Sequence, residues 1–320
     1  MIAGFPIHLI STLRCTSDGA TLLLSQNSEL SEDGSQIING SVHCQACCTE
    51  FMINDGILNM LNTIVLDEES MLEQRIRNER AIKAAKAEGP AWYENAYGYA
   101  ELIPTLDAVA ANPTQTILEL GCGDGRYTVL LAEQCQWVVA VDFSLESLRI
   151  LQHRPGNRRN IALVLGDITT LQTDAEHFDC ALSTLVSNLP TRSHRDAMYR
   201  LASIALKPTG RFVFGTHHQG FWQRLRGEAK SGRYRESGIY RYLFTVRECQ
   251  AEVQSFFSSV SARPIQIHLP FAGLLRLPLV KISRLMESLP LINTLGDLIL
   301  CTAEKPIRFE SRIGPRIPTA

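Results

Sequence analysis

The chain has 320 residues, of which 45% are hydrophobic and 20% are charged, and its formal net charge is −2. This composition is that of an ordinary globular protein, and the length favours one large domain with an accessory domain. A net charge so close to zero argues against a protein that attracts nucleic acid through its overall electric field. We therefore do not expect nucleic acid as the partner.

Targeting signals and disulfide bonds are not expected. The first ten residues are mildly apolar, but they lack a basic segment and are too few to cross a bilayer. The most apolar later stretch, residues 269–300, is interrupted by prolines and charged residues. Nine cysteines spread over a large chain suit reduced thiols better than a disulfide framework. The sequence thus predicts a cytoplasmic protein without a transmembrane segment.

The first 112 residues divide into two parts of different character. Residues 1–61 alternate short apolar runs with turn-forming stretches, which predicts a small β-rich module. Residues 62–112 predict a helical linker or cap, with helices over residues 64–88 and 99–111, because good helix formers are frequent there and Gly-Pro or Asn-Pro follows each segment.

Residues 113–305 alternate between apolar strands and helical segments. This alternation predicts an α/β domain with a mostly parallel, doubly wound sheet. Seven strands are expected at residues 116–120, 137–141, 161–165, 178–184, 211–216, 260–267 and 297–304, and helices near residues 124–135, 145–153, 194–206 and 246–257. Two long insertions, residues 217–245 and 269–296, are expected to cover a binding site or to carry structure of their own, and residues 306–320 form a tail.

The strongest motif is a glycine-rich turn after the first of these strands. Residues 117–126 are Ile-Leu-Glu-Leu-Gly-Cys-Gly-Asp-Gly-Arg, and their three glycines permit a sharp turn and a close approach of the backbone to a ligand. A strand–turn–helix without a ligand is one interpretation. A dinucleotide site is disfavoured, because Arg126 stands where its fingerprint requires glycine. The carboxylates of Glu119 and Asp124 would repel a pyrophosphate, whereas they suit a positively charged cofactor.

This turn resembles the first motif of the class I methyltransferases, Glu/Asp-x-Gly-x-Gly-x-Gly, and the resemblance covers about residues 110–305. It implies S-adenosylmethionine as the cofactor. Asp142, at the end of the second strand, would accept hydrogen bonds from the ribose hydroxyls, and Asp167, after the third strand, would meet the adenine amine. The cofactor-binding residues implied in this way are Glu119, Gly121, Cys122, Gly123, Gly125, Asp142, Phe143, Asp167, Ile168 and Thr184.

The acceptor side is less well marked. Ser187-Asn188-Leu189-Pro190 follows the fourth strand, and His217-His218-Gln219 follows the fifth. A neutral histidine is a suitable base, so His217 or His218 is a candidate catalytic residue, with Asn188 orienting the acceptor. The alternative is a pair of polar residues that cap a strand. The Asn/Asp-Pro-Pro-Tyr signature of base and glutamine amino-group methylation is missing, which favours other acceptors, with O-methylation as our expectation.

The two insertions offer two kinds of acceptor. Residues 224–247 carry seven basic residues interleaved with aromatic ones, which predicts either a solvated face or a lid over an anionic acceptor. Residues 269–295 are rich in Leu, Ile and Pro, which predicts either core-packing helices or the wall of a pocket for a lipophilic acceptor.

A metal site is expected in the amino-terminal module. Cys15, Asp18, Cys44 and Cys47 form two knuckle-like pairs about thirty residues apart, as in zinc ribbons, except that Asp18 stands where a thiolate is usual. Residues 13–61 also resemble the small zinc-ribbon module that is fused to, or partners, methyltransferases. Structural zinc is one outcome, Cys48 is an alternative ligand, and a module that folds without metal is the other outcome.

Three functions remain open from the sequence. The first is a methyltransferase of a small-molecule, lipid-like or natural-product acceptor. The second is a methyltransferase of ribosomal or transfer RNA bases, since some bacterial rRNA guanine methyltransferases resemble this chain in carrying an amino-terminal zinc ribbon. The third is a non-catalytic partner protein built on a methyltransferase scaffold, which the intact cofactor motif argues against.

Overall fold

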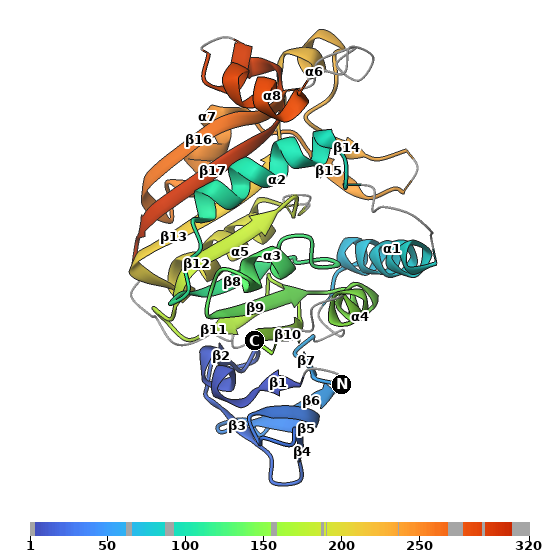
Figure 1. Ribbon diagram of the computed structural model, residues 1–320, viewed down its shortest axis with the longest axis vertical. Helices are drawn as coiled ribbons and strands as arrows, with labels where there is room; N and C mark the ends of the chain where they lie inside the picture. Colours follow the sequence, from blue (N-terminus) through green and yellow to red (C-terminus); the bar gives the residue numbers. More distant parts are fainter. Residues whose placement is uncertain are drawn as a thin grey trace, which may run out of the picture.

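The computed structural model describes residues 4–61, 66–86, 93–154, 159–186, 189, 191–235, 237–267, 278–289 and 292–308. Its centre is the predicted α/β domain. The seven expected strands are present as β8 (Thr116–Leu120), β9 (Trp137–Asp142), β10 (Ile161–Leu165), β12 (Phe178–Thr184), β13 (Leu206–His217), β16 (Phe257–Ile267) and β17 (Gly296–Pro306). Their order in the sheet is β10-β9-β8-β12-β13-β17-β16, and only β17 runs antiparallel to its neighbours (Figure 1).

The central strands are buried on both faces because nearly all of their residues are apolar. Successive side chains of a strand point to opposite faces. In β9, Val138 and Ala140 therefore pack into one hydrophobic cluster, and Val139 and Val141 pack into the other.

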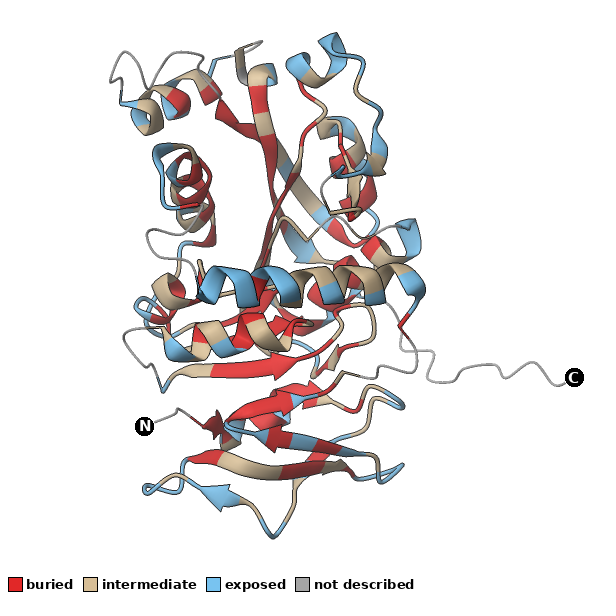
Figure 2. Ribbon diagram, turned by 90° about the vertical axis from the view of Figure 1, so that its right-hand side faces the viewer, coloured by how far each residue is buried: buried red, intermediate tan, exposed pale blue. Residues whose placement is uncertain are grey.

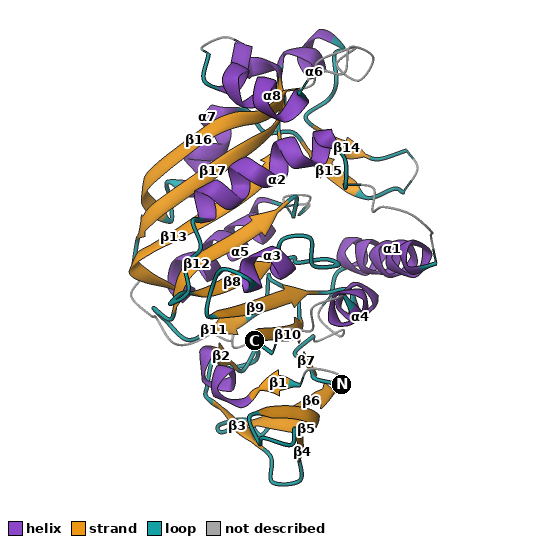
Figure 3. Cartoon of the chain, in the orientation of Figure 1, coloured by secondary structure: helices purple, strands orange, loops and turns teal. Residues whose placement is uncertain are grey.

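Helices cover both faces of the sheet (Figures 1 and 3). One face holds α2 (Ala96–Val109), α3 (Thr128–Ala132) and α4 (Leu145–His153), and the other holds α5 (Arg192–Ala205) and α7 (Val246–Val253). Most of these helices begin where a side chain accepts a hydrogen bond from the first turn; the capping residues are Asn95, Ser144, Thr191 and Thr245. The helix expected over 124–135 begins only at Thr128, because the preceding glycines turn the chain.

The amino-terminal region is rich in strands, as expected, but it does not form a separate sheet. Its elements are β1 (Phe5–Pro6), η1 (Ile7–Thr12), β2 (Leu13–Arg14), β3 (Leu22–Leu24), β4 (Glu29–Leu30), β5 (Gln36–Cys44), β6 (Glu50–Asn54) and β7 (Ile57–Asn59). Strand β7 pairs in parallel with β10, with Ile57 opposite Leu163. The result is one continuous sheet of 13 strands in the described chain.

The amino-terminal module also occupies the place where a crossover helix between β10 and β12 would pack on the sheet. Residues 166–177, between β10 and β12, hold only the short strand β11 (Gln172–Thr173), which pairs with β2. Leu9 and Ile10 of η1 join the same hydrophobic cluster as Val139 and Val141 of β9. The apolar face that a crossover helix would cover is therefore covered by the module.

Both insertions contain helices or strands in the described part of the chain. Residues 217–245 contain α6 (Phe221–Leu225) and the hairpin of β14 (Ser231–Arg233) and β15 (Tyr240–Tyr242). Of residues 269–296, α8 (Leu279–Glu287) and η3 (Ile292–Leu295) are described, but residues 268–277 and 290–291 lie outside the described chain, and with them most of the expected lipophilic wall. None of the helices in the described part combines the length and the apolar character needed to cross a bilayer.

Several elements begin or end a few residues away from the expectation, among them β13 and β17. Strand β13 begins at Leu206 rather than at residue 211, because the Leu-Lys-Pro-Thr-Gly turn already lies beside β12. Strand β17 extends through Pro306, so the tail begins one residue later than expected.

Candidate functional site

The glycine-rich turn lies at the carboxyl end of β8 and has the strained backbone that glycine permits. Gly121, Gly123 and Gly125 have φ angles of 77°, 56° and 86°. A Cβ atom on Gly121 would lie 2.3 Å from a methyl of Val186, and one on Gly125 would lie 2.2 Å from a methyl of Leu151. A Cβ atom on Gly123 would meet nothing within 4 Å, so this glycine faces open space above the turn.

Two carboxylates flank the turn. Asp142, at the end of β9, accepts hydrogen bonds from the backbone N–H groups of Gly123 and Ser144, each at 2.8 Å. Glu119 in β8 is almost fully buried and accepts a hydrogen bond of 2.6 Å from the hydroxyl of Thr128. Burial raises the pKa of Glu119 to about 8, and it also raises the pKa of Asp142. The structure thus brings both predicted carboxylates against the turn.

The remaining predicted cofactor residues line up along the same edge. Asp167 follows β10, and its carboxylate accepts two hydrogen bonds of 2.8 Å from the backbone and hydroxyl of Thr169. Thr184 ends β12, and Cys122 and Ile168 are buried beside the strand ends. We call this edge, with Glu119, residues 121–125, Asp142, Phe143, Asp167, Ile168 and Thr184, the cofactor edge.

A charged helix borders the cofactor edge, which the motif analysis did not anticipate. Helix α1 (Glu68–Ala85) lies alongside α4 (Figure 2). Gln74 donates a hydrogen bond of 2.8 Å to the carbonyl of Phe143, and Asn78 accepts one of 2.7 Å from the hydroxyl of Ser144. The sequence showed a helix here, but no signal indicated which element it would contact.

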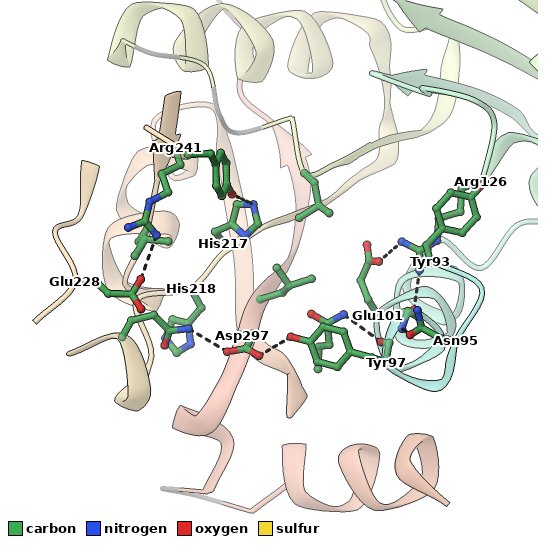
Figure 4. A pocket seen from close by; sticks show the side chains of 17 residues that line it. Tyr93, Asn95, Tyr97, Glu101, Arg126, His217, His218, Glu228, Arg241 and Asp297 are labelled. Atoms are coloured by element: carbon green, nitrogen blue, oxygen red, sulfur yellow. Dashed lines mark hydrogen bonds and ion pairs between the residues drawn. The ribbon is translucent and has the colours of Figure 1, made fainter. Parts of the chain in front are cut away.

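A cavity of about 360 Å³ lies beside the cofactor edge (Figure 4). We call it the acceptor pocket, after the substrate that we propose for it below. Its walls come from the first turn of α2, the glycine-rich turn, the ends of β12 and β13, the insertion 217–245, and β16 and β17. The residues that carry its polar chemistry are Tyr93, Tyr97, Glu101, Arg126, His217, His218, Gln223, Glu228, Tyr234, Arg241 and Asp297.

Both candidate histidines line the acceptor pocket, but their surroundings differ. Nδ1 of His218 lies 2.7 Å from the carbonyl oxygen of Gly296, which only accepts, so Nδ1 carries the hydrogen and Nε2 keeps a lone pair. Nε2 of His217 lies 3.1 Å from the hydroxyl of Tyr234, and burial lowers the pKa of His217 to about 4. Burial also lowers the pKa of His218, so both rings are neutral near pH 7. Asn188 lies outside the described residues.

Three carboxylates in the acceptor pocket escaped the sequence analysis. Glu101 forms an ion pair with Arg126 and accepts a hydrogen bond of 2.6 Å from Tyr127. Glu228 forms an ion pair of 3.1 Å with Arg241. Asp297 is the third. No sequence motif could have revealed these three carboxylates, because they lie far apart in the sequence, in α2, in the insertion 217–245 and in β17.

Four of the seven basic residues in 224–247 form ion pairs with acidic residues. Arg226 and Arg241 both pair with Glu228, and Lys230 pairs with Glu248. Arg233 pairs with Glu69 of α1, which links the β14–β15 hairpin to that helix.

The four expected metal ligands meet in the amino-terminal module. The ligand atoms of Cys15, Asp18, Cys44 and Cys47 all lie within 4.8 Å of one another. The Sγ atoms of Cys15 and Cys47 are 3.6 Å apart, and Sγ of Cys44 is 3.4 Å from both carboxylate oxygens of Asp18. Cys48 is exposed and does not belong to this group, so the alternative of Cys48 as a ligand is not supported.

The architecture is shared with a protein of known structure. Over 72% of this chain and 99% of the other, it is similar to the N-methyltransferase NodS from Bradyrhizobium japonicum WM9 in complex with S-adenosyl-L-homocysteine, with a TM-score of 0.51 and 16% identity. The fold is that of the class I methyltransferases. Within it, residues 117–210 match a family model described as a methyltransferase domain.

Relatives by sequence are similar to about a third of the chain. The cypemycin N-terminal methyltransferase of a Streptomyces species is 33% identical over 122 residues, which are 38% of this chain and 49% of that protein. The "Probable ribosomal RNA small subunit methyltransferase A" of Methanosarcina acetivorans is 32% identical over 110 residues, which are 34% of this chain and 38% of that protein. The chain thus spans less than half of the length of either relative.

Proposed function

We propose that this chain is an S-adenosylmethionine-dependent methyltransferase whose acceptor is a small molecule held in the acceptor pocket. The observation that carries the proposal is the glycine-rich turn of residues 121–125, flanked by the carboxylates of Glu119 and Asp142 and matched by the family model over residues 117–210. The acceptor pocket beside this turn is the cavity in which we propose that the methyl acceptor binds.

The residues of the cofactor edge fit this cofactor. Gly123 leaves open space where a side chain would otherwise project, and Asp142 has acceptor oxygens beside that space. Burial raises the pKa of Glu119 and of Asp142, and a ligand with positive charge near the turn would stabilise the ionised form of both groups. When bound, S-adenosylmethionine supplies a methyl group on a positively charged sulfur, which departs as a neutral thioether.

The acceptor pocket supplies a candidate base. His218 is fixed by its hydrogen bond to the carbonyl of Gly296, which leaves the lone pair of Nε2 available. In this proposal His218 removes a proton from the acceptor, and the remaining pocket residues hold the acceptor in line with the methyl group. His217 is the second candidate for the base, but its Nε2 lies within hydrogen-bond distance of the hydroxyl of Tyr234.

Calorimetry with S-adenosylhomocysteine tests the proposal. Wild-type protein is expected to bind it. Gly123→Ala is expected to weaken binding at least about tenfold, because the new methyl group enters the space above the turn. Gly227→Ala is the matched control, since Gly227 also has a positive φ angle, 65°, and also has nothing within 4 Å of a Cβ atom. It should lose about 1 kcal/mol of stability and no affinity. A wild-type protein without affinity for this ligand or for S-adenosylmethionine would favour the non-catalytic scaffold.

RNA methylation is the second candidate, and the relative from Methanosarcina acetivorans favours it. Its test is the electrophoretic mobility of ribosomal RNA with the protein at several salt concentrations. A complex whose affinity falls steeply with salt would move the proposal from a small molecule to RNA. No complex at low salt would leave the small-molecule acceptor as the better proposal.

We also propose that Cys15, Asp18, Cys44 and Cys47 hold a structural zinc ion. Their four ligand atoms already lie close enough to share one ion, and all four positions are supplied by protein, which is typical of structural sites. Backbone N–H groups of Ser17 and Ala46 point to the sulfurs of Cys15 and Cys44, at 3.4 and 3.3 Å.

Metal analysis by plasma mass spectrometry tests the zinc site. One zinc per chain is expected in wild-type protein and in Cys48→Ser, and substantially less in Cys44→Ser. Removal of zinc by a chelator should lower the melting temperature, because the ion links both ends of the module. A wild-type protein that contains no zinc after expression in zinc-supplemented medium, and whose melting temperature does not rise with added zinc, would contradict the site.

A further inference from the structure

Asp297 is the feature of the acceptor pocket that the proposed function leaves unexplained. It lies near the start of β17, and its two carboxylate oxygens point to groups from two other segments (Figure 4). The hydroxyl of Tyr97 in α2 donates to one oxygen at 2.5 Å, and Nε2 of Gln223 in α6 donates to the other at 3.0 Å. Both donors are uncharged, so they orient the carboxylate without neutralising it.

The charges of the acceptor pocket do not balance. Its lining contains three carboxylates, those of Glu101, Glu228 and Asp297, and two guanidinium groups, those of Arg126 and Arg241. Each arginine is paired with a glutamate. Among the described residues, Asp297 has no cationic partner within ion-pair distance, so one negative charge is left over in the pocket.

The two histidines of the pocket do not offset this charge. Burial keeps His217 and His218 neutral near pH 7, because it lowers the pKa of both rings. Three tyrosines, Tyr93, Tyr97 and Tyr234, contribute aromatic rings to the walls. Two of these rings already face guanidinium groups of the pocket, Tyr93 that of Arg126 at 5.0 Å and Tyr234 that of Arg241 at 5.9 Å, as expected of aromatic faces that attract cations.

We propose that Asp297 binds an ammonium group of the acceptor, so that the substrate class of this enzyme is a small amine. The inference rests on the proposed methyltransferase function and adds the chemistry of the acceptor. Tyr97 and Gln223 are the positioning residues that hold the carboxylate toward the pocket. The amine replaces our earlier expectation of an anionic or hydroxyl acceptor, because four of the seven basic residues behind that expectation already have acidic partners.

Binding of matched probes tests this assignment without any need for turnover. Benzylamine, benzyl alcohol and benzoate have closely similar shapes but carry a positive, no and a negative charge near neutral pH. Their affinities are measured by ligand-observed NMR titration, with and without S-adenosylhomocysteine. We expect benzylamine to bind at least about tenfold more tightly than benzyl alcohol, as a charge-assisted hydrogen bond provides, and benzoate to bind most weakly.

Two variants show whether Asp297 causes the preference for benzylamine over benzyl alcohol. Asp297→Asn should remove the preference for benzylamine over benzyl alcohol. Glu304→Gln, an exposed change on the same strand, should keep it. Equal binding of amine and alcohol by wild-type protein, tighter binding of benzoate, or a preference that survives in Asp297→Asn would overturn the proposal. If Asp297→Asn fails to fold, the wild-type ranking of the three probes still decides.

The probes also separate this proposal from the one on which it rests. Failure to bind S-adenosylhomocysteine would contradict the methyltransferase function, whatever the probes do. Normal binding of S-adenosylhomocysteine without a preference for the amine would contradict only the role of Asp297.

Discussion

The cofactor edge and the acceptor pocket are neighbours in space, but they are built differently from the chain. All residues of the cofactor edge lie between Glu119 and Thr184, at or just after the carboxyl ends of four adjacent strands. The residues of the acceptor pocket extend from Tyr93 to Leu298 and come from helices, an insertion and the antiparallel strand β17. The cofactor edge can therefore be recognised as a motif in one stretch of the sequence. The residues of the acceptor pocket come together only when the chain folds.

Variants that affect one of these regions and spare the other are the sharpest test of this comparison. The largest effect is expected for His218→Ala. Loss of the base should lower turnover by about a hundredfold or more and leave the affinity for S-adenosylhomocysteine nearly unchanged, because His218 belongs to the acceptor pocket alone. The measurement is formation of S-adenosylhomocysteine with the best acceptor among small primary amines.

His217→Ala is the comparison for that variant, since its ring is engaged with Tyr234. It should lose less activity than His218→Ala. Wild-type activity in both variants would remove histidine from the mechanism, and a loss of cofactor affinity in either would show that the two regions are not separable in this way.

The next effect concerns the pH dependence of stability at the cofactor edge. The carboxyl of Glu119 has a pKa of about 8 in the folded protein, above its ordinary value of 4.5. The stabilisation from this group is therefore complete below pH 4.5 and is lost as the pH rises through 8. Wild-type protein should lose about 3–4 kcal/mol more than Glu119→Gln between about pH 5 and about pH 8.

Urea unfolding at the two pH values measures this difference. The exposed change Glu304→Gln should show the same change in unfolding free energy between the two pH values as wild-type protein. If Glu119→Gln and wild-type protein change equally in unfolding free energy between the two pH values, Glu119 keeps an ordinary pKa in spite of its burial.

The smallest effect is expected at Asp142. Asp142→Ala should weaken the binding of S-adenosylhomocysteine by at least about tenfold, because hydrogen bonds to a charged acceptor contribute roughly 1.5–3 kcal/mol. Binding of benzylamine should stay as in wild-type protein. Asp179→Ala is the control: Asp179 also accepts a backbone hydrogen bond, from Thr116, but at the opposite end of the strands. An unchanged affinity in Asp142→Ala would contradict the assignment of this residue to the cofactor.

The sequence predicted the strands of the central sheet well, because their apolar runs are bounded by turn residues and buried on both faces. Strands β8, β10 and β12 have the expected bounds. Helix α3 was expected to be longer, since helix propensity does not reveal where the glycine-rich turn releases the chain. The continuity of the sheet through β7 was missed, because a three-residue strand carries no sign of its partner.

The acceptor pocket could be predicted only in part, for a related reason. His217 and His218 were found because they end a predicted strand beside a known motif. Asp297 looked like the start of a strand, Glu101 looked like an ordinary residue of a helix, and Tyr97 lay outside the predicted helices. Their meeting depends on how α2 and β17 cross the sheet, which no local pattern of residues encodes.

The pairing of β7 with β10 has a consequence for how copies of this protein behave toward one another. Without it, β10 would present a row of free N–H and C=O groups at the border of a large parallel sheet, and such a border is a template on which a second chain can add a strand. The amino-terminal module occupies that border from within the same chain. Proteolytic loss of the module would therefore be expected to favour aggregation, even if every residue of the glycine-rich turn stayed intact.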